Sequence, residues 1–142
     1  MDIRVLLVDD EVQFVELLAE RLDTRGFKVQ TAFTGEEALL KLQQENVDVV
    51  VLDVFMPGKD GLETLRAIKQ LQPLVEVIML TGHATVETGI EGMRLGAFDY
   101  LLKPTETEEL VAKIKKGSAR KIAQEKRIRR AEQESEVGSG SL

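Results

Sequence analysis

Short apolar runs alternate with segments of helical periodicity five times along this chain. The runs cover residues 3–8, 28–33, 47–52, 75–80 and 98–102. Each is followed by a segment whose apolar residues recur every three or four positions, the spacing of a helix with one buried face. This alternation predicts an α/β fold, a five-stranded parallel sheet with helices on both faces and right-handed connections. In such a sheet, ligands bind beyond the carboxyl ends of the strands.

Capping residues mark where several of the helices begin. Thr34 and Thr105 each precede a glutamate by three positions, the spacing of a capping box, and Asp60 stands in the same relation to Glu63. Within the run at 28–33, apolar and polar residues alternate, which predicts a strand at the edge of the sheet. Two glycines are expected to end helices, Gly26 and Gly96.

The composition is that of an ordinary globular chain. Its 142 residues are 43% hydrophobic and 31% charged, enough for one domain with a buried core. No cysteine is present, which excludes disulfides and thiolate metal sites. No apolar run reaches membrane-spanning length and no signal segment precedes the first strand, so we expect a cytoplasmic protein that binds no membrane.

Charge is distributed unevenly along the chain. Residues 113–130 hold nine basic residues against one acidic residue, a net +8, which leaves −14 for the rest of a chain whose total is −6. We therefore expect an acidic domain over residues 1–116 and a basic helical extension over residues 117–142 with a flexible Gly/Ser tail. The boundary falls at Gly117 and Ser118, where the last helix is expected to end or kink.

The basic extension is open to three interpretations. It is a solvated helix, a docking surface for an acidic partner, or the start of a linker to an output domain. Direct nucleic-acid binding is disfavoured, because the body of the chain is acidic and no recognition motif is present.

Polar residues of complementary chemistry follow the predicted strands. The first strand ends in Asp9 and Asp10, the third in Asp53, the fourth in Thr81 and the fifth in Lys103. The carboxyl ends of parallel strands lie at one edge, so we expect these side chains to converge. Clustered carboxylates repel each other unless a hard cation neutralises them, and oxygen ligands without His or Cys favour Mg²⁺. Lys103 and Thr81 suit the oxygens of a phosphoryl group, and Asp53 suits its acceptor.

Each of these residues also has an ordinary structural interpretation. Asp10 is placed to cap the first helix, with Gln13 at the capping-box position. Asp53 and Thr81 are typical turn residues, and Lys103 is a typical solvated charge. Taken singly, these interpretations are the simpler ones. Taken together, four strand ends with complementary chemistry favour a phosphoryl site.

The set Asp9-Asp10, Asp53, Thr81 and Lys103-Pro104 resembles the receiver domain of two-component response regulators. This is the chemotaxis-regulator-like family, and the run from residue 82 to 102 is most similar to its NtrC-like subgroup. The resemblance covers residues 2–116 and implies the strand order 2-1-3-4-5 of flavodoxin-like, doubly wound folds. It includes the motifs Met56-Pro57-Gly58, Asp60-Gly61 and Phe98-Asp99-Tyr100.

The resemblance implies a role for each site residue. Asp53 would accept a phosphoryl group from a sensor histidine kinase or a histidine phosphotransfer domain. Mg²⁺ or Mn²⁺ would be held by Asp9, Asp10, Asp53 and the backbone carbonyl of Phe55, while Thr81 and Lys103 would bind phosphoryl oxygens and the bond between Lys103 and Pro104 would be cis. The protein would be a signalling receiver that catalyses only its own phosphorylation and dephosphorylation, and that switches conformation to control a partner or output domain.

Three further features are implied by the same resemblance. Thr81 and Tyr100 would form the conformational switch, although Tyr100 also fits a partly buried aromatic with a solvated hydroxyl. Phe55 and His83, the only histidine, would tune the rate of dephosphorylation. A homodimer would form through the fourth helix, fifth strand and fifth helix.

The helix at 85–95 is expected to be the one whose position changes. It contains Gly89 and Gly92, and an interior glycine costs about 1 kcal/mol relative to alanine. Its intrinsic stability is therefore the lowest among the predicted helices.

Three other classes of protein are alternatives to a receiver. An FMN protein of the same strand order needs a Ser/Thr/Gly-rich phosphate loop where this chain has Asp9-Asp10-Glu11. A haloacid-dehalogenase-type phosphatase needs a second aspartate two residues after the first, at the position of Phe55. A structural or scaffolding role with a degenerate site stays open on chemical grounds, although no site residue is missing.

Overall fold

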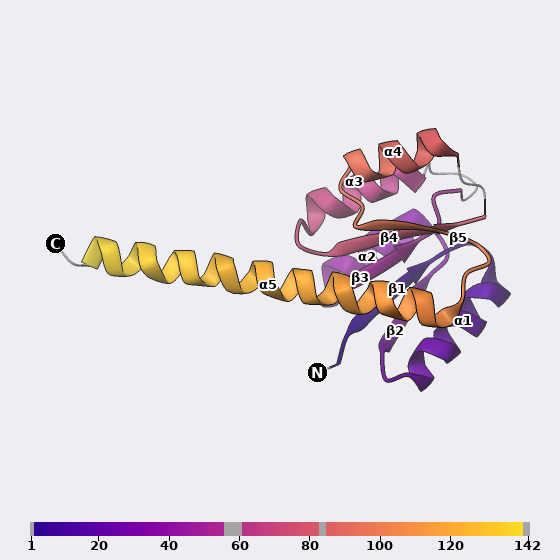
Figure 1. The fold of residues 1–142 in the computed structure, drawn as a ribbon, viewed down its shortest axis with the longest axis horizontal. Helices are drawn as coiled ribbons and strands as arrows, with labels where there is room; N and C mark the ends of the chain where they lie inside the picture. The colour runs from indigo at the N-terminus through magenta and orange to yellow at the C-terminus, as the bar shows by residue number, and fades with distance from the viewer. Residues whose placement is uncertain (1, 56–60, 83–84, 141–142) are drawn as a thin grey trace.

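One sheet of parallel strands forms the centre of the molecule (Figure 1). The computed structural model describes residues 2–55, 61–82 and 85–140. The strands lie in the order β2-β1-β3-β4-β5, as the resemblance implies, and the edge position expected for β2 is confirmed. Their bounds are β1 Arg4–Val8, β2 Lys28–Ala32, β3 Val49–Leu52, β4 Glu76–Thr81 and β5 Asp99–Leu102.

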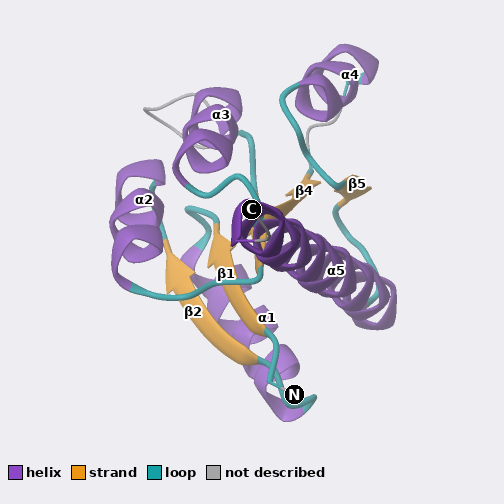
Figure 2. Cartoon of the chain, turned by 90° about the vertical axis from the view of Figure 1, so that its left-hand side faces the viewer, coloured by secondary structure: helices purple, strands orange, loops and turns teal. Residues whose placement is uncertain are grey.

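Helices cover both faces of this sheet (Figure 2). One face carries α1 (Val12–Thr24) and α5 (Thr107–Gly140). The opposite face carries α2 (Gly35–Gln44), α3 (Gly61–Leu71) and α4 (Val86–Arg94). The doubly wound α/β fold predicted from the alternating pattern is confirmed.

The core consists of two apolar layers, one on each side of the sheet. Every residue of β3 and β4 is buried. Alternate residues of β3 point to opposite sides: Val50 and Leu52 join the layer under α2 and α3, while Val49 and Val51 join the layer under α1 and α5. This period of two, with both faces apolar, explains why the run reads as continuously hydrophobic.

The predicted helix boundaries are confirmed in part. Thr34 caps α2, accepting the N–H of Glu37 at 3.1 Å, while the Glu37 carboxylate reaches back to the N–H of Phe33. Gly26 and Gly96 follow α1 and α4 with φ of 91° and 105°, a conformation that favours glycine.

Two other capping predictions have different outcomes. The box at Thr105 is wrong: α5 begins at Thr107, and the Thr105 hydroxyl donates to the Glu109 carboxylate instead of accepting a backbone N–H. The expected cap of α3, Asp60, lies outside the described residues.

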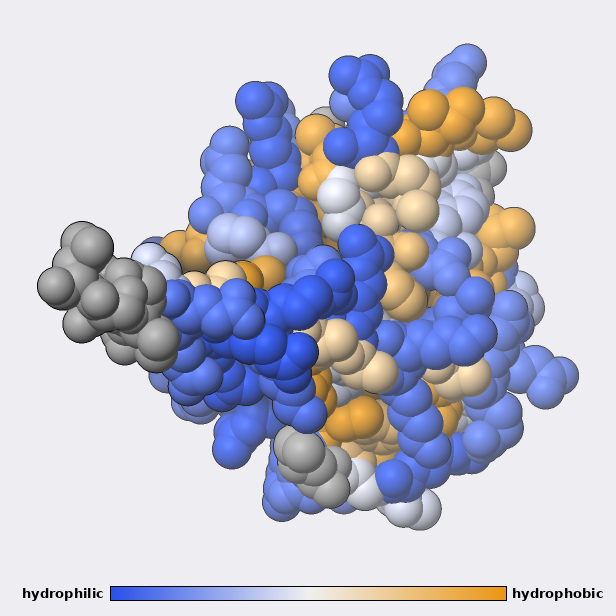
Figure 3. Space-filling view, turned by 60° about the vertical axis from the view of Figure 1, so that its left-hand side comes forward, coloured by the Kyte–Doolittle hydropathy of each residue, from blue (hydrophilic) through white to orange (hydrophobic). Residues whose placement is uncertain are grey.

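The last helix continues through the point where it was expected to end or kink. Gly117 and Ser118 are both buried within α5, because the helix packs here against the sheet. A Cβ on Gly117 would lie 3.4 Å from the Glu76 side chain and 3.5 Å from that of Val49, which are ordinary contact distances, so the helix lies directly against the sheet here. Beyond this contact, α5 projects from the body (Figure 1) with a largely hydrophilic surface (Figure 3).

Ion pairs hold α5 to the body at the edge of the sheet opposite the carboxyl ends of the strands. Lys121 Nζ lies 3.1 Å from Asp48 Oδ1, and the other oxygen of Asp48 accepts the N–H of Arg4. Arg120 lies 3.6 Å from the buried carboxylate of Glu76. The helix is thus fixed to the sheet beyond residue 116. None of the helices described is both long enough and apolar enough to cross a membrane.

Candidate functional site

The sheet register brings the predicted site residues to one edge. Val8 of β1 pairs with Leu52 of β3, so Asp9 and Asp53, the residues that follow them, leave the sheet side by side. Thr81, the last residue of β4, pairs with Leu102 of β5, and Lys103 follows directly. Residues far apart in the sequence therefore meet at the carboxyl ends of four parallel strands.

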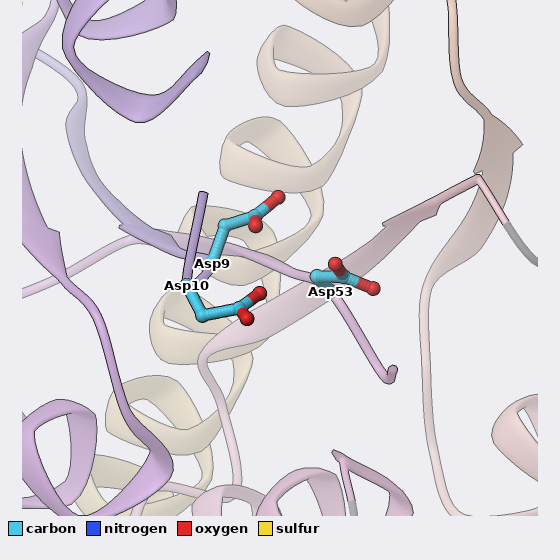
Figure 4. A group of neighbouring side chains, drawn as sticks. All are labelled: Asp9, Asp10 and Asp53. Carbon is cyan, nitrogen blue, oxygen red and sulfur yellow. The ribbon is translucent and has the colours of Figure 1, made fainter. Parts of the chain in front are cut away.

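Three carboxylates form a compact acidic group at this edge (Figure 4). Asp9, Asp10 and Asp53 each offer an oxygen atom, and these oxygens all lie within 4.8 Å of one another. Asp9 and Asp53 are 4% and 5% exposed, whereas Asp10 is exposed. Oxygen-only ligands at this spacing, two of them buried, fit a hard divalent cation that retains water on its open side. The donor set therefore agrees with the predicted metal site.

The two buried carboxylates are oriented by their own backbone. Asp53 Oδ1 accepts the N–H of Phe55 at 2.9 Å, and Asp9 Oδ1 accepts the N–H of Glu11 at 3.0 Å. Each is an Asx turn, in which an aspartate bonds the backbone two residues ahead. The turn-forming interpretation of Asp53 is thus correct, and it also leaves the second oxygen of each carboxylate facing the site.

Asp10 does not cap α1. The residue at the N-cap position is Glu11, and its side chain makes no capping hydrogen bond. The alternative interpretation of Asp10 is therefore wrong, and its carboxylate lies with Asp9 and Asp53 instead.

Lys103 supplies the positive charge of the site. Its Nζ lies 2.6 Å from Asp9 Oδ2, 3.0 Å from Glu11 Oε1 and 3.6 Å from Asp53 Oδ2. The ammonium also lies 4.3 Å from the centre of the Phe14 ring, a cation–π contact. With 13% of its side chain exposed, Lys103 is not the solvated charge of the simpler interpretation.

Burial and pairing shift the pKa values of this pair. Burial lowers the pKa of Lys103, but hydrogen bonds to Asp9 and Glu11 and the nearby negative charges outweigh it, so this pKa lies above its usual value. Burial raises the pKa of Asp9, and hydrogen bonds from Lys103 and the N–H of Glu11 offset this only in part. Lys103 is therefore held as a cation at the centre of the site. The peptide bond between Lys103 and Pro104 is cis, as the resemblance implies.

The other predicted residues lie around this centre. Thr81 is fully buried at the end of β4, and Phe55 is 44% exposed beside Asp53. The Tyr100 hydroxyl is buried and has no hydrogen-bond partner within the part of the chain that the structure describes, so its interpretation as a solvated hydroxyl is wrong. Its ring lies against α4, 3.7 Å from where a Cβ on Gly89 would be. His83 lies outside the described residues.

Two residues at this site were missed from the sequence. Glu11 and Phe14 both contact Lys103 from the start of α1. Glu11 belongs to the acidic run after the first strand, which was a signal for it. Phe14 belongs to the apolar stripe of α1, and nothing in that spacing distinguishes it from a core residue.

Comparison with known proteins decides the family. The model of the response regulator receiver domain matches residues 5–115. The chain belongs to this family. Among curated relatives, the transcriptional regulatory protein CpxR of Klebsiella pneumoniae is 41% identical over 139 residues, which are 98% of this chain and 57% of CpxR. This chain thus spans just over half the length of that relative.

Solved receiver structures share the fold. A CheY-like receiver domain protein from Methanospirillum hungatei is 29% identical with a TM-score of 0.83, covering 87% of this chain and 99% of its own. A response regulator from Burkholderia pseudomallei is 30% identical with a TM-score of 0.77, covering 87% of this chain and 73% of its own. That structure holds a phosphorylated aspartic acid and a calcium ion. A receiver close to this one in fold is therefore seen with both a phosphoryl group and a divalent cation.

Proposed function

We propose that this receiver accepts a phosphoryl group on Asp53 from a sensor histidine kinase or a histidine phosphotransfer domain. The observation that carries the proposal is the position of the Asp53 carboxylate, beside two other carboxylates and 3.6 Å from the ammonium of Lys103. The carboxylates of Asp9 and Asp10 on one side of Asp53 suit a bound metal cation. The ammonium of Lys103 on the other side suits the oxygens of a phosphoryl group. The relative with a phosphorylated aspartic acid supports the same chemistry.

The transfer needs little beyond positioning and charge neutralisation. An oxygen of the ionised Asp53 carboxylate attacks phosphorus in line with the leaving group, an O–P bond forms, and the N–P bond of the phosphohistidine breaks. The departing imidazole nitrogen keeps the electron pair and takes a proton from solvent. Thr81 and Lys103 bind the phosphoryl oxygens from the ends of β4 and β5. Hydrolysis of the acyl phosphate restores the carboxylate, so the chain acts as a signalling receiver that catalyses only its own modification.

A bound Mg²⁺, or Mn²⁺, would neutralise charge on the transferring group. Its ligands would be Asp9, Asp10, Asp53 and the backbone carbonyl of Phe55. The Asx turns of Asp9 and Asp53 support this assignment, because they fix the carboxylates before any ligand arrives.

Phosphorylation would be transmitted through Thr81 and Tyr100. It adds about −1.5 to −2 charges and three acceptor oxygens, which attract the Thr81 hydroxyl. The Tyr100 hydroxyl is buried without a partner among the described residues, an energetically poor position that a new arrangement relieves. Its ring lies against α4 at Gly89, so movement of Tyr100 alters the support of that helix.

The surface around α4 is the proposed contact for a second receiver. Large apolar side chains are exposed there on α4 and β5, and their burial in a homodimer through α4, β5 and α5 would be favourable. These side chains are Val86 at 79% exposure, Ile90 at 58%, Met93 at 48% and Leu102 at 53%.

We propose that the chain divides by function between residues 116 and 117, although α5 packs continuously across this point. Residues 1–116 form the receiver and residues 117–142 the basic extension, whose first part is packed on the sheet through Lys121. The extension would carry the signal to a partner or output domain. We propose a cytoplasmic location, without direct contact of this chain with nucleic acid.

Two positions are proposed to tune the lifetime of the acyl phosphate. Phe55 is exposed beside Asp53, and His83 follows the end of β4 by two residues. His83→Ala is expected to change the rate at which the phosphoryl group is lost, measured by intact mass against time. An unchanged lifetime would remove His83 from the proposal.

Acetyl phosphate provides the test of the function. With Mg²⁺, the intact mass of the protein is expected to rise by one phosphoryl group. The increase should be absent in Asp53→Asn and after chelation of the metal, and retained in the matched variant Asp99→Asn, which removes a carboxylate distant from the site. A wild-type chain whose mass does not change would refute the proposal.

A further inference from the structure

The ammonium of Lys103 already has two hydrogen-bond partners in this structure. A lysine has three N–H donors, and two of them donate to Asp9 Oδ2 at 2.6 Å and to Glu11 Oε1 at 3.0 Å. The distance to Asp53 Oδ2, 3.6 Å, exceeds that of a hydrogen bond. A phosphoryl group on Asp53 therefore meets a lysine with two of its three N–H donors directed to other carboxylates.

Of these two partners, Glu11 is the one that can be released at least cost. The Asp9 side chain is 6% exposed and is fixed by the N–H of Glu11. The Glu11 side chain is 62% exposed, so its carboxylate regains water when it leaves Lys103. Removing the partner of a buried charge costs far more than opening an exposed ion pair.

The Glu11 side chain contacts Lys103 and takes no part in capping α1. Glu11 is the N-cap residue of α1, a position where the short side chains of Ser, Thr, Asp and Asn ordinarily accept a backbone N–H of the first turn. It makes no such bond, and α1 has no acidic residue in its first turn. The carboxylate is directed to Lys103, while Phe14, one turn along the same helix, contacts the same ammonium. When the carboxylate leaves Lys103, it therefore breaks no capping bond of α1.

Resting on the function proposed above, we infer that Glu11 is a positioning residue that competes with the phosphoryl group for Lys103. In the unphosphorylated receiver, Glu11 holds the ammonium on the α1 side of the site. When Asp53 is phosphorylated, a phosphoryl oxygen replaces the Glu11 carboxylate as the acceptor of that N–H. The strength of the Glu11 pair thus sets how readily the site takes up a phosphoryl group.

The pair contributes modestly, because one partner is exposed. Such pairs contribute up to about 1 kcal/mol, a factor of roughly five in an equilibrium constant. Loss of the pair is therefore expected to tighten binding of a phosphoryl analogue by roughly two- to fivefold.

The test is a titration of the full chain with beryllium fluoride, monitored by backbone amide NMR. The Mg²⁺ concentration is kept high enough to saturate each variant. Glu11→Gln keeps the size of the side chain and removes its charge. Glu11→Asp keeps the charge but shortens the side chain by one methylene, which withdraws the carboxylate from Lys103. Glu16→Gln makes the same charge change on the exposed side of α1.

We expect Glu11→Gln and Glu11→Asp to bind beryllium fluoride two- to fivefold more tightly than the wild type, with Glu16→Gln unchanged. If Glu11→Gln binds as the wild type does, or if Glu11→Asp retains wild-type affinity, competition by the Glu11 pair is overturned. An equal gain in Glu16→Gln overturns it as well, because that result indicates general charge repulsion. A wild-type chain that does not bind the analogue overturns the proposed function itself, and with it this role for Glu11.

Discussion

The first turn of α3 lies directly against the backbone next to Asp53, and Gly61→Ala tests the importance of this contact. A Cβ on Gly61 would lie 2.2 Å from both the Cα and the carbonyl oxygen of Val54. The N–H of Gly61 donates to that same oxygen at 3.2 Å. The obstacle is backbone rather than a flexible side chain, so the helix or the end of β3 must move.

The free-energy cost of that movement depends on how tightly α3 and the segment after β3 are packed in the core. Leu65 and Ile68 of α3 are completely buried in the core, and Val54 is 5% exposed. Overpacking of a core typically costs about 1–3 kcal/mol, and rigid surroundings favour the upper part of that range. We expect Gly61→Ala to lower the free energy of unfolding by about 2–3 kcal/mol, a fall in Tm of roughly 5–12 °C for a chain of this size. Binding of beryllium fluoride should also weaken, because Val54 adjoins Asp53.

Gly92→Ala is the matched control. Its Cβ would also meet an atom at 2.2 Å, but that atom is the terminal methyl of Met79, a flexible side chain. Alanine also gains about 1 kcal/mol of helix propensity, so the net change should stay within about 1 kcal/mol. Urea unfolding followed by circular dichroism measures both variants. Wild-type stability in Gly61→Ala, or an equal loss in Gly92→Ala, would show that backbone contact at Val54 is not the cause.

Three further predictions concern other parts of the fold. Burial raises the pKa of Asp99, but hydrogen bonds from Lys113 and the N–H of Tyr100 outweigh it and lower the pKa below its usual value. Asp99→Asn should therefore lose stability at neutral pH, and the difference should vanish as pH falls through the lowered pKa; a pH-independent difference in urea unfolding would contradict this. Asp48→Asn keeps an acceptor for the N–H of Arg4 but weakens the pair with Lys121, so it should cost about 1–2 kcal/mol and speed hydrogen exchange in α5 around that lysine; unchanged exchange there would contradict the anchoring of α5. Beryllium fluoride with Mg²⁺ should change hydrogen exchange in α4 and leave α2 unaffected, and equal protection of α4 in both states would count against its role as the moving element.

Much of the fold could be predicted because its signals are local. Apolar runs of strand length alternate with helical stripes, and parallel connection alone brings Asp9, Asp53, Thr81 and Lys103 to one edge. The order of the strands required the family resemblance, because neighbours in a sheet are chosen by packing between segments distant in sequence.

The failures at residues 105, 117 and 118 have a common physical cause. Glycine inside a helix is locally unfavourable, so Gly117 indicated an end or a kink, yet the helix continues through it because it packs there against Glu76 and Val49. Thr105 has the spacing of a cap, but its hydroxyl bonds the Glu109 side chain. In both cases a tertiary or side-chain contact overrides a local preference that is worth about 1 kcal/mol.

Part of the site escaped prediction for a similar reason. Contact of Glu11 and Phe14 with Lys103 depends on the direction in which side chains leave the start of α1. Spacing in the sequence does not encode that direction. The residues proposed to bind the metal and the phosphoryl group could thus be named from the sequence. Glu11, which we propose competes for Lys103, could not.

The most direct test of the central claim is to locate the acyl phosphate. After incubation with acetyl phosphate and Mg²⁺, borohydride reduces an aspartyl phosphate to homoserine, and peptide mass spectrometry identifies the residue. We predict homoserine at position 53 and at no other aspartate. Homoserine at Asp9 or Asp10, or an unmodified Asp53 in a protein that has gained a phosphoryl group, would contradict the account.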